Sequence, residues 1–464
     1  MKFRFVLAII AAKAAIIFLR MINYGGTSLP GKIALLIYPG ILKELSSSFK
    51  VIAITGTNGK TTTSRVIAQM LKENGIGYIA NKSGANLLNG ITTTFIEAVN
   101  IKGTSNVSTA LLEMDEAAFN KIIEHLEPHV TVVTNFFRDQ LDRYGEVYST
   151  LNSVLTGIRK TPGSALVLNA DDSLCASLGK DSGNKVVYYG FSPSAWNSTE
   201  NTLNNDAAFC LYCKAPYDYE NRVYGHLGGF ICRDCGYRHP GSTVTCTGIE
   251  ELNANHSRVK LDLDGTTVDT VINLPAIYNI YNALAGCACG IAMGFSHDSI
   301  IKALSEFEPG FGRMEKIKKD DKSIRVILIK NPTGFNQVLD YILNENNDEN
   351  KSFNIAFLIN DNAADGRDIS WLWDVNIEKL GKIYDKIITA YVSGTRGPDM
   401  AVRLKYADFD TKKIKHVEDY NRIINEALET TPGNGTFYIL PTYTAMLDIR
   451  YILKNKFKLK EFWE

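Results

Sequence analysis

The chain has 464 residues, of which 45% are hydrophobic and 22% are charged, as in an ordinary folded protein. This length exceeds what one hydrophobic core usually organises, so we expect two or three domains. Lysine plus arginine and aspartate plus glutamate number 50 each, for a formal net charge of zero, which gives no support to nucleic acid as the main partner.

The amino-terminal segment, residues 1–45, is expected to form an apolar helix followed by a glycine- and proline-containing turn. The run Phe5–Leu19 is strongly apolar, but Lys13 interrupts it, and it is shorter than the roughly 20 residues that cross a bilayer. Lys2, Lys13 and Arg20 are separated by nearly whole helical turns and therefore share one face. The pattern favours equally an interfacial helix on a membrane and a helix packed on the protein. A cleaved signal peptide is not expected, because no small-x-small site follows.

The next segment, Val51–Met70, predicts a strand, a phosphate-binding loop and a helix. An apolar β-branched run gives way to GTNGKT, a short form of the GxxxxGK[ST] motif, and then to helical spacing. Gly56 and Gly59 let several backbone N–H groups face one anion at the positive end of a helix dipole. The Lys60 ammonium would bind the β- and γ-phosphates of ATP, and the Thr61 hydroxyl would bind Mg²⁺. The expected nucleotide contacts in this segment are Gly56, Thr57, Asn58, Gly59, Lys60, Thr61 and Thr62.

Strand and helix patterns alternate after residue 46 and predict a largely parallel sheet that is covered on both faces. Ligands bind such sheets at the carboxyl ends of the strands. Glu113, Asn135 and Asn169 each follow a strand directly. A carboxylate in this position is suited to bind Mg²⁺, so Glu113 is the expected second metal ligand. The expected strands are Val51–Ile54, Tyr78–Ala80, Ser108–Leu112, Val130–Thr134, Ala165–Leu168 and Val186–Tyr189.

An insertion at about 196–245 carries a four-cysteine metal motif. Cys210-x₂-Cys213 is followed, eighteen residues later, by Cys232-x₂-Cys235. This spacing is typical of a zinc ribbon. Four thiolates leave no open coordination position, so the predicted zinc is structural. The remaining cysteines have no partner spacing and are predicted to be buried thiols, namely Cys175, Cys246, Cys287 and Cys289.

The central domain is expected to span residues 46–318. Its last part predicts a hairpin around Asp264, a helix at Tyr278–Met293 that carries Asn282, and a helix that Ser296 caps. Arg313 follows in PGFGRME, a glycine-lined turn in which a guanidinium could reach phosphate.

Residues 319–464 predict a second, smaller α/β domain. One loop in it has the sequence NDNAADGRDISWLWD, which places Asp361, Asp365 and Asp368 directly before two tryptophans. So many carboxylates after a strand favour a binding site or an interface over a solvated loop. KNPTG, at Lys330–Gly334, is a further loop of note. The expected strands are Arg325–Ile329, Ile355–Ile359, Ile387–Tyr391 and Phe437–Leu440.

Taken together, these motifs resemble the Mur ligases, ATP-dependent enzymes that join an amine to a carboxylate through an acyl phosphate. The resemblance rests on GTNGKT, LLEMDE, NFFRDQLDRYGE, NIYNALAG and GFGRME, and it covers almost the whole chain. The cysteine ribbon and the DNAADGRDISWLWD loop narrow it to the synthetase subunits of lipid II isoglutaminyl synthases, whose partner is a GatD-like glutaminase.

The resemblance implies ATP-driven amidation of the α-carboxylate of D-glutamate in the lipid II stem peptide, giving D-isoglutamine. It implies that Lys60 and Thr61 bind triphosphate and Mg²⁺, that Glu113 holds metal, and that Asn282 contacts the nucleotide with Arg313 near phosphate. Asp368 would complete the Cys-His-Asp triad of the glutaminase across the interface, although Asp361 and Asp365 lie in the same loop. The protein would be cytoplasmic and peripheral at the inner face of the plasma membrane.

Two departures from the wider family stand out. Only about 45 residues precede the phosphate loop, where ligases of soluble UDP-linked precursors carry a nucleotide-sugar domain, and a lipid-linked substrate needs no UDP pocket. Many members also bridge metals with a carbamylated lysine, and no equivalent is identified after Tyr144. The metal arrangement near Asp142 is therefore left unassigned. Two other functions stay open at this point: a ligase that adds an amino acid, as folylpolyglutamate or cyanophycin synthetases do, and a nucleotide-gated scaffold.

Overall fold

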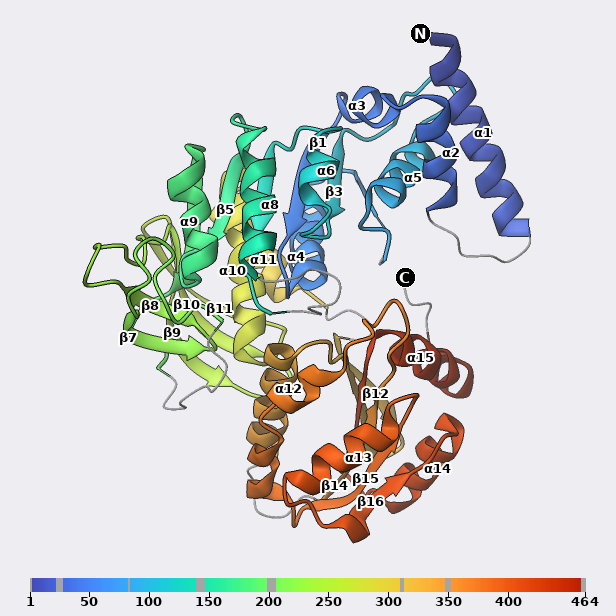
Figure 1. Ribbon diagram of the computed structural model, residues 1–464, viewed down its shortest axis with the longest axis vertical. Helices are drawn as coiled ribbons and strands as arrows, with labels where there is room; N and C mark the ends of the chain where they lie inside the picture. Colours follow the sequence, from blue (N-terminus) through green and yellow to red (C-terminus); the bar gives the residue numbers. More distant parts are fainter. Residues whose placement is uncertain are drawn as a thin grey trace.

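The structure is a computed structural model that describes residues 2–21, 28–81, 84–138, 147–197, 206–308, 313–346 and 352–459. Two large sheets form its two halves, one nine-stranded and one six-stranded, and a two-stranded sheet lies beside the first (Figure 1). This arrangement is the α/β class that the alternating patterns predict.

The nine-stranded sheet has the order β11-β10-β9-β6-β5-β4-β1-β3-β2. In sheet order, all neighbouring strands from β2 across to β9 are parallel. Strand β10 is antiparallel to β9, and β11 is antiparallel to β10. The six strands expected in this region are confirmed to within two residues at each end, whereas β9 was not predicted. The strands are β1 (Lys50–Thr55), β2 (Tyr78–Ala80), β3 (Thr109–Glu113), β4 (Val130–Val133), β5 (Ala165–Asn169), β6 (Val186–Phe191), β9 (Val244–Leu252), β10 (Ser257–Leu263) and β11 (Thr266–Ile272).

Helices cover both faces of this sheet because its central strands are apolar on both sides. Along β1, Ile52 and Ile54 pack into one hydrophobic core, while Val51 and Ala53 pack into the other. The first core is closed by α4 (Lys60–Glu73), α10 (Ile277–Ala292) and α11 (His297–Ser305). The second is closed by α5 (Leu88–Ala98), α6 (Phe119–Ile123), α8 (Val147–Arg159) and α9 (Ser173–Ser182).

Three amino-terminal helices, α1 (Lys2–Met21), α2 (Leu29–Ile37) and α3 (Ile41–Ser46), extend the second core at one end of the molecule (Figure 1). Helix α1 packs along α2, and α2 packs on α5. Among the described residues, none of the helices has the length and apolar character needed to cross a membrane.

The insertion folds onto the outer part of the nine-stranded sheet. Its strands β7 (Asp218–Tyr224) and β8 (Leu227–Ile231) pair with each other. Tyr217, Phe230 and Tyr237 form a small aromatic core beside two of the cysteines.

The six-stranded sheet has the order β12-β13-β17-β14-β15-β16 and is parallel except for the edge strand β12. Strand β12 begins at Arg313, so this sheet starts before residue 319, where the second domain was expected. The strands are β12 (Arg313–Lys319), β13 (Lys322–Ile327), β14 (Phe353–Leu358), β15 (Ile387–Ser393), β16 (Ile414–His416) and β17 (Thr436–Pro441). Its helices are α12 (Pro332–Glu345), η1 (Ser370–Asp374), η2 (Ile377–Ile383), α13 (Gly397–Tyr406), η3 (Thr411–Lys413), α14 (Tyr420–Thr430) and α15 (Tyr443–Phe457).

Candidate active site

The loop between β1 and α4 has a conformation that its glycines make possible. Gly56 has φ 119° and Gly59 has φ 87°, both in the region that favours glycine. A Cβ atom at Gly59 would lie 2.0 Å from the Asn282 side chain, and one at Gly56 would lie 2.4 Å from the Thr134 hydroxyl. Side chains at these positions would therefore disrupt the loop, which starts α4 at the carboxyl end of a buried strand.

Residues after β4 hold this loop in place. The backbone N–H of Asn58 donates to Oδ1 of Asn135 (2.9 Å), and the Asn58 carbonyl accepts from the Thr134 hydroxyl (2.7 Å). The backbone N–H of Thr57 donates to the Asn135 carbonyl (2.9 Å). Asn135, which the sequence placed directly after a strand, thus supports the phosphate loop from the neighbouring strand.

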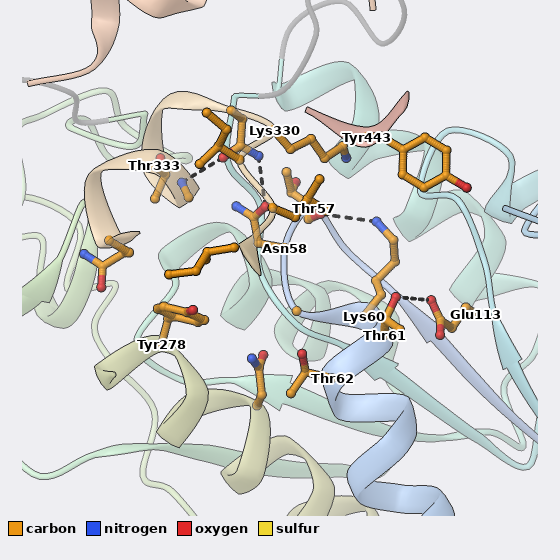
Figure 2. Close-up of a pocket in the computed structure, with 18 of the residues that line it drawn as sticks. Thr57, Asn58, Lys60, Thr61, Thr62, Glu113, Tyr278, Lys330, Thr333 and Tyr443 are labelled. Carbon is orange, nitrogen blue, oxygen red and sulfur yellow. Dashed lines mark hydrogen bonds between the residues drawn. The ribbon is translucent and has the colours of Figure 1, made fainter. Parts of the chain in front are cut away.

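The first two residues of α4 each contact a carboxylate at or just after the end of β3, and Figure 2 shows one of these contacts, between Thr61 and Glu113. The Thr61 hydroxyl donates to Oε2 of Glu113 at 2.8 Å. Lys60 Nζ lies 2.9 Å from Oε2 of Glu116 and donates to the carbonyls of Gly56 and Thr57. The Lys60 and Glu116 side chains are 12% and 3% exposed, so this ion pair is largely screened from water. Thr61 and Glu113 bring two hard oxygen donors together, which fits Mg²⁺.

Lys60, Thr61 and Glu113 line a cleft of about 430 Å³ between the two sheets. The facing wall comes from the segment between β13 and α12, including Lys330, Asn331 and Thr333 (Figure 2). The side-chain amide of Asn331 donates to Oδ1 of Asn58 at 2.9 Å, while its own Oδ1 caps α12 by accepting from the Gly334 N–H. The second half of the chain therefore contacts the phosphate loop directly.

The first turns of α10 supply a third wall. Tyr278, Asn279 and Asn282 line the cleft, and the Asn282 amide donates to Oδ1 of Asn279 at 3.0 Å. Figure 2 shows Tyr278 on the α10 side of the cleft, across from Lys60. An aromatic ring and two amides beside a phosphate loop can bind a nucleoside.

The three aspartates of the loop after β14 have different surroundings. Asp361 accepts from the Thr395 hydroxyl (2.8 Å) and pairs with Arg396 (2.7 Å), and these two contacts hold the pKa of Asp361 below its usual value. Asp365 is buried against Thr444 and lines the cleft. Asp368 is half-buried, and its Oδ1 accepts from the backbone N–H of Ser370, the first residue of η1.

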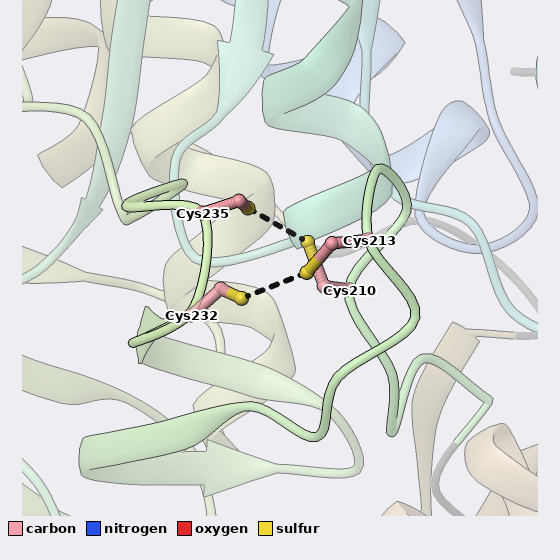
Figure 3. A group of neighbouring side chains, drawn as sticks. All are labelled: Cys210, Cys213, Cys232 and Cys235. Atoms are coloured by element: carbon pink, nitrogen blue, oxygen red, sulfur yellow. Dashed lines mark hydrogen bonds between the residues drawn. The ribbon is translucent and has the colours of Figure 1, made fainter.

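The four insertion cysteines converge at a separate place (Figure 3). Their ligand atoms all lie within 4.8 Å of one another. Each Cys-x₂-Cys pair forms the same turn, because Lys214 and Gly236, both in the left-handed region, donate N–H groups to the carbonyls of Cys210 and Cys232 (each 3.0 Å). Burial raises the pKa of Cys210, but hydrogen bonds, led by those from the backbone N–H groups of Cys213 and Tyr212, lower it overall to about 6. Four convergent cysteine sulfurs are a ligand set that fits zinc.

Comparison with known proteins shows the family. Residues 54–224 match the Mur ligase middle domain, and residues 328–446 match the MurT ligase C-terminal domain. The MurT subunit of lipid II isoglutaminyl synthase (glutamine-hydrolyzing) from Streptococcus pneumoniae R6 is 34% identical, over 98% of this chain and 98% of that protein. The chain belongs to the MurT family.

Other comparisons agree with that family. The MurT subunit from Staphylococcus aureus COL is 32% identical over 97% of each chain. A pseudomurein peptide ligase type C from Methanothermus fervidus has a TM-score of 0.64 at 24% identity, covering 88% of this chain and 79% of that one. The likeness to the pseudomurein peptide ligase shows that this chain has the Mur ligase fold.

In this MurT family member, the structure brings most of the predicted nucleotide site together. Thr57 through Thr62, Glu113 and Asn282 all line the cleft. The cysteine cluster and Asp368 are not among the lining residues. Arg313 begins β12, paired with Ile327, and is not in a turn as expected. The Arg313 side chain lies outside the described residues, as do Asp142 and Tyr144.

Sequence reasoning noted the KNPTG loop but gave no role to three residues at or beside the cleft of this MurT family member. Glu116 lies three residues after Glu113 in LLEMDE and holds Lys60. Lys330 and Asn331 lie in KNPTG, directly after a strand, which is where ligand-binding residues were expected on the other sheet. The same strand-end criterion, applied to the second domain, would have found them.

Proposed function

We propose that the chain is the ATP-dependent synthetase subunit of a lipid II isoglutaminyl synthase. It would convert the α-carboxylate of D-glutamate in the lipid II stem peptide to the amide of D-isoglutamine. The observation that carries the proposal is the cleft in which Lys60, Thr61 and Glu113 face Lys330 and Asn331. The relatives that are named as this subunit, at 32–34% identity over nearly the full length, support the choice of substrate.

The proposed reaction has two steps. First, a carboxylate oxygen of the substrate attacks the γ-phosphorus of ATP, which gives an acyl phosphate and releases ADP. Ammonia then attacks the carbonyl carbon, the carbon–oxygen bond to phosphate breaks, and a proton is lost from nitrogen. Phosphoryl transfer needs mainly positioning and charge neutralisation. Lys60 and the N–H groups of the loop would provide both on one side of the cleft, and Lys330 on the other.

Magnesium fits the pair of oxygens that Thr61 and Glu113 present 2.8 Å apart. When bound there, the ion would neutralise charge on the β- and γ-phosphates. The chain's own part is to fix these ligands. Asn81 supports that role, because its side chain hydrogen-bonds to both the N–H and the carbonyl of Glu113 (each 2.9 Å).

Ammonia is proposed to come from a GatD-like glutaminase partner. Asp361 is already paired and Asp365 is buried against Thr444, so Asp368 is the loop aspartate best placed to meet another polypeptide. Ala364 and Asp365 of the same loop line the cleft. The loop therefore extends from a partner-accessible position to the place where ammonia is needed. Because the proposed substrate is attached to a lipid, the enzyme would work as a peripheral protein at the cytoplasmic face of the plasma membrane.

The first test replaces the phosphate-loop lysine. Lys60→Ala should lower amidation of lipid II with free ammonium by on the order of a hundredfold or more, because a cation aimed at the transferring phosphoryl group is lost. Product formation is followed by mass spectrometry of the stem peptide. Lys72→Ala, in the last turn of α4, is the matched control. The wild-type protein is also assayed with the partner, ATP and magnesium. The proposal would be refuted if this mixture added an amino acid to the substrate and left the α-carboxylate unmodified.

The second test separates the two nitrogen sources. Asp368→Asn should spare ammonium-driven turnover but abolish the glutamine-driven reaction of the assembled complex. Asp374→Asn, a nearby acid in η1, should leave both reactions intact. Equal loss of both reactions in Asp368→Asn would show that this residue has a different role.

A further inference from the structure

We propose that the outer face of α1 and α2 is a docking surface for an anionic lipid bilayer. We define the α1–α2 face by its exposed apolar side chains, which are Phe3, Leu7, Ile10, Ala14, Ile17, Phe18 and Met21 of α1 and Leu29 and Leu36 of α2. The inference extends the proposed function, which places the enzyme at a membrane but does not identify the contact. Bilayer binding itself requires no catalytic activity.

Helix α1 is apolar on two opposite sides, and the protein uses only one of them. Phe5, Ala8, Ile9, Ala12 and Ile16 are buried in the core that α2 and α5 share. On α1, the residues of the α1–α2 face recur mainly at spacings of three and four. They form a second apolar stripe along the length of α1. Packing within the protein thus accounts for one stripe and leaves the other in contact with water.

The exposure of this second stripe is large for a folded protein. Phe3 is 79% exposed, Ile17 60%, Phe18 62% and Met21 78%, and Leu36 of α2 is 72% exposed. A continuous exposed apolar surface of this kind marks an interaction site more often than chance, whereas isolated exposed residues do not. With 20 residues, α1 is about 30 Å long, enough for a helix to lie along a bilayer surface.

The charge around this face indicates which partner it fits. The chain is neutral overall, yet its first acidic residue is Glu44, and six basic residues precede that position. On the helix, Arg4 lies on one flank of the stripe and Lys13 and Arg20 lie on the other, where Arg20 also pairs with Glu97 of α5 (2.9 Å) and stays 68% exposed. Long basic side chains can bury their stems in apolar surroundings and keep their charge at a phosphate layer. A basic border around an apolar stripe matches an anionic lipid surface, where each cation contributes attraction.

The place of the face in the molecule favours a membrane over other occupants. A second copy docked on it through a two-fold axis would bring the same cations together. The six-stranded sheet, which carries the Asp368 loop, lies in the other half of the molecule (Figure 1). Helix α5 begins beside the cleft, which Leu87 lines, and packs on α2. Helix α5 therefore connects the α1–α2 face to the cleft in which the stem peptide of a lipid-linked substrate would bind.

The test is flotation of the full chain with vesicles of phosphatidylglycerol and with vesicles of phosphatidylcholine. Wild-type protein should float with the anionic vesicles, and added salt should weaken this binding. Ile17→Glu and Phe18→Glu should each reduce the bound fraction on the order of tenfold, because each removes a large apolar contact with the lipid and adds repulsion. Tyr451→Glu, at a similarly exposed position of α15, is the matched control and should bind normally.

Three outcomes would overturn the proposal. These are equal flotation of wild type and the two α1 variants, absence of wild-type binding to anionic vesicles, and a wild-type dimer in solution that Ile17→Glu dissociates. Thermal unfolding of each variant checks that it is folded, which is expected because both side chains are already exposed. Amidation of a water-soluble short-chain substrate should be unchanged in the variants, which separates failure of docking from failure of the proposed reaction.

Discussion

Lys60 is the central residue of the proposed nucleotide site, and groups of the chain itself surround its charge. Its ammonium contacts two loop carbonyls and the buried carboxylate of Glu116. Thr61, one position later, points to Glu113 instead. The two carboxylates are three residues apart, Glu113 at the end of β3 and Glu116 just after it, and each contacts a different residue of α4. We infer that Glu113 serves metal binding and that Glu116 positions the lysine.

This division of roles predicts different effects for two similar changes. Glu113→Gln should raise the magnesium concentration needed for half-maximal activity and lower turnover, because a neutral amide binds the ion poorly. Glu116→Gln should leave the magnesium requirement near that of the wild type, since the residue contacts Lys60 and not Thr61. Magnesium titrations of ATP-dependent activity compare the two. A larger magnesium shift in Glu116→Gln would reverse the assignment.

At the scale of elements, the cysteine insertion is a small folded unit fixed to the central sheet. The Tyr237 hydroxyl donates to the carbonyl of Ser173 (2.6 Å), and His239 pairs with the buried Asp171 (2.7 Å). Both contacts lie at or just before the start of α9. The insertion core is only a few aromatic rings, so we expect a metal to hold its two turns together.

The metal should therefore contribute to stability and not to chemistry. Cys213→Ser should reduce bound zinc, measured by elemental analysis, and lower the midpoint of thermal unfolding by several degrees. Nucleotide binding should persist, because the cluster does not line the cleft. Cys246→Ser changes a buried cysteine outside the cluster and should keep its zinc. Normal zinc content in Cys213→Ser would exclude that residue as a ligand.

For the whole molecule, the important feature is the cleft between the two sheets. Asn331 caps α12 with its side-chain oxygen and reaches Asn58 with its side-chain nitrogen. One residue thus links the geometry of the second domain to the phosphate loop of the first. Relative movement of the domains would open or close the site, and closure would keep water from the proposed acyl phosphate.

Replacing Asn331 tests this link without removing the cap. Asn331→Ser can still cap the helix but cannot reach Asn58, so the Kd for ATP should rise about fivefold, as expected for one lost hydrogen bond. Asn331→Asp should weaken binding further, because it adds negative charge beside the phosphates. Isothermal titration calorimetry measures both variants. Wild-type affinity in Asn331→Ser would show that the contact does not influence nucleotide binding.

Much of the fold and part of the site could be predicted from sequence because their signals are local. A β-branched run, two glycines and a lysine within a few residues specify the strand, the loop and the start of α4. Cysteine spacing similarly specifies two metal-binding turns, and alternating patterns specify two α/β sheets. Each of these features depends on residues that are close in the chain, where backbone geometry fixes their relative positions.

Tertiary structure alone decided the features that join distant segments. The contact between Asn331 and Asn58 spans 273 positions, and no pattern in either segment indicates it. The three aspartates of one loop can be told apart only from their contacts: Asp361 pairs with Arg396, and Asp365 is buried against Thr444. Helix α1 is apolar on two opposite sides, so its periodicity could not show which stripe is buried. The positions of α2 and α5 decided that, because burial depends on which surfaces meet in space.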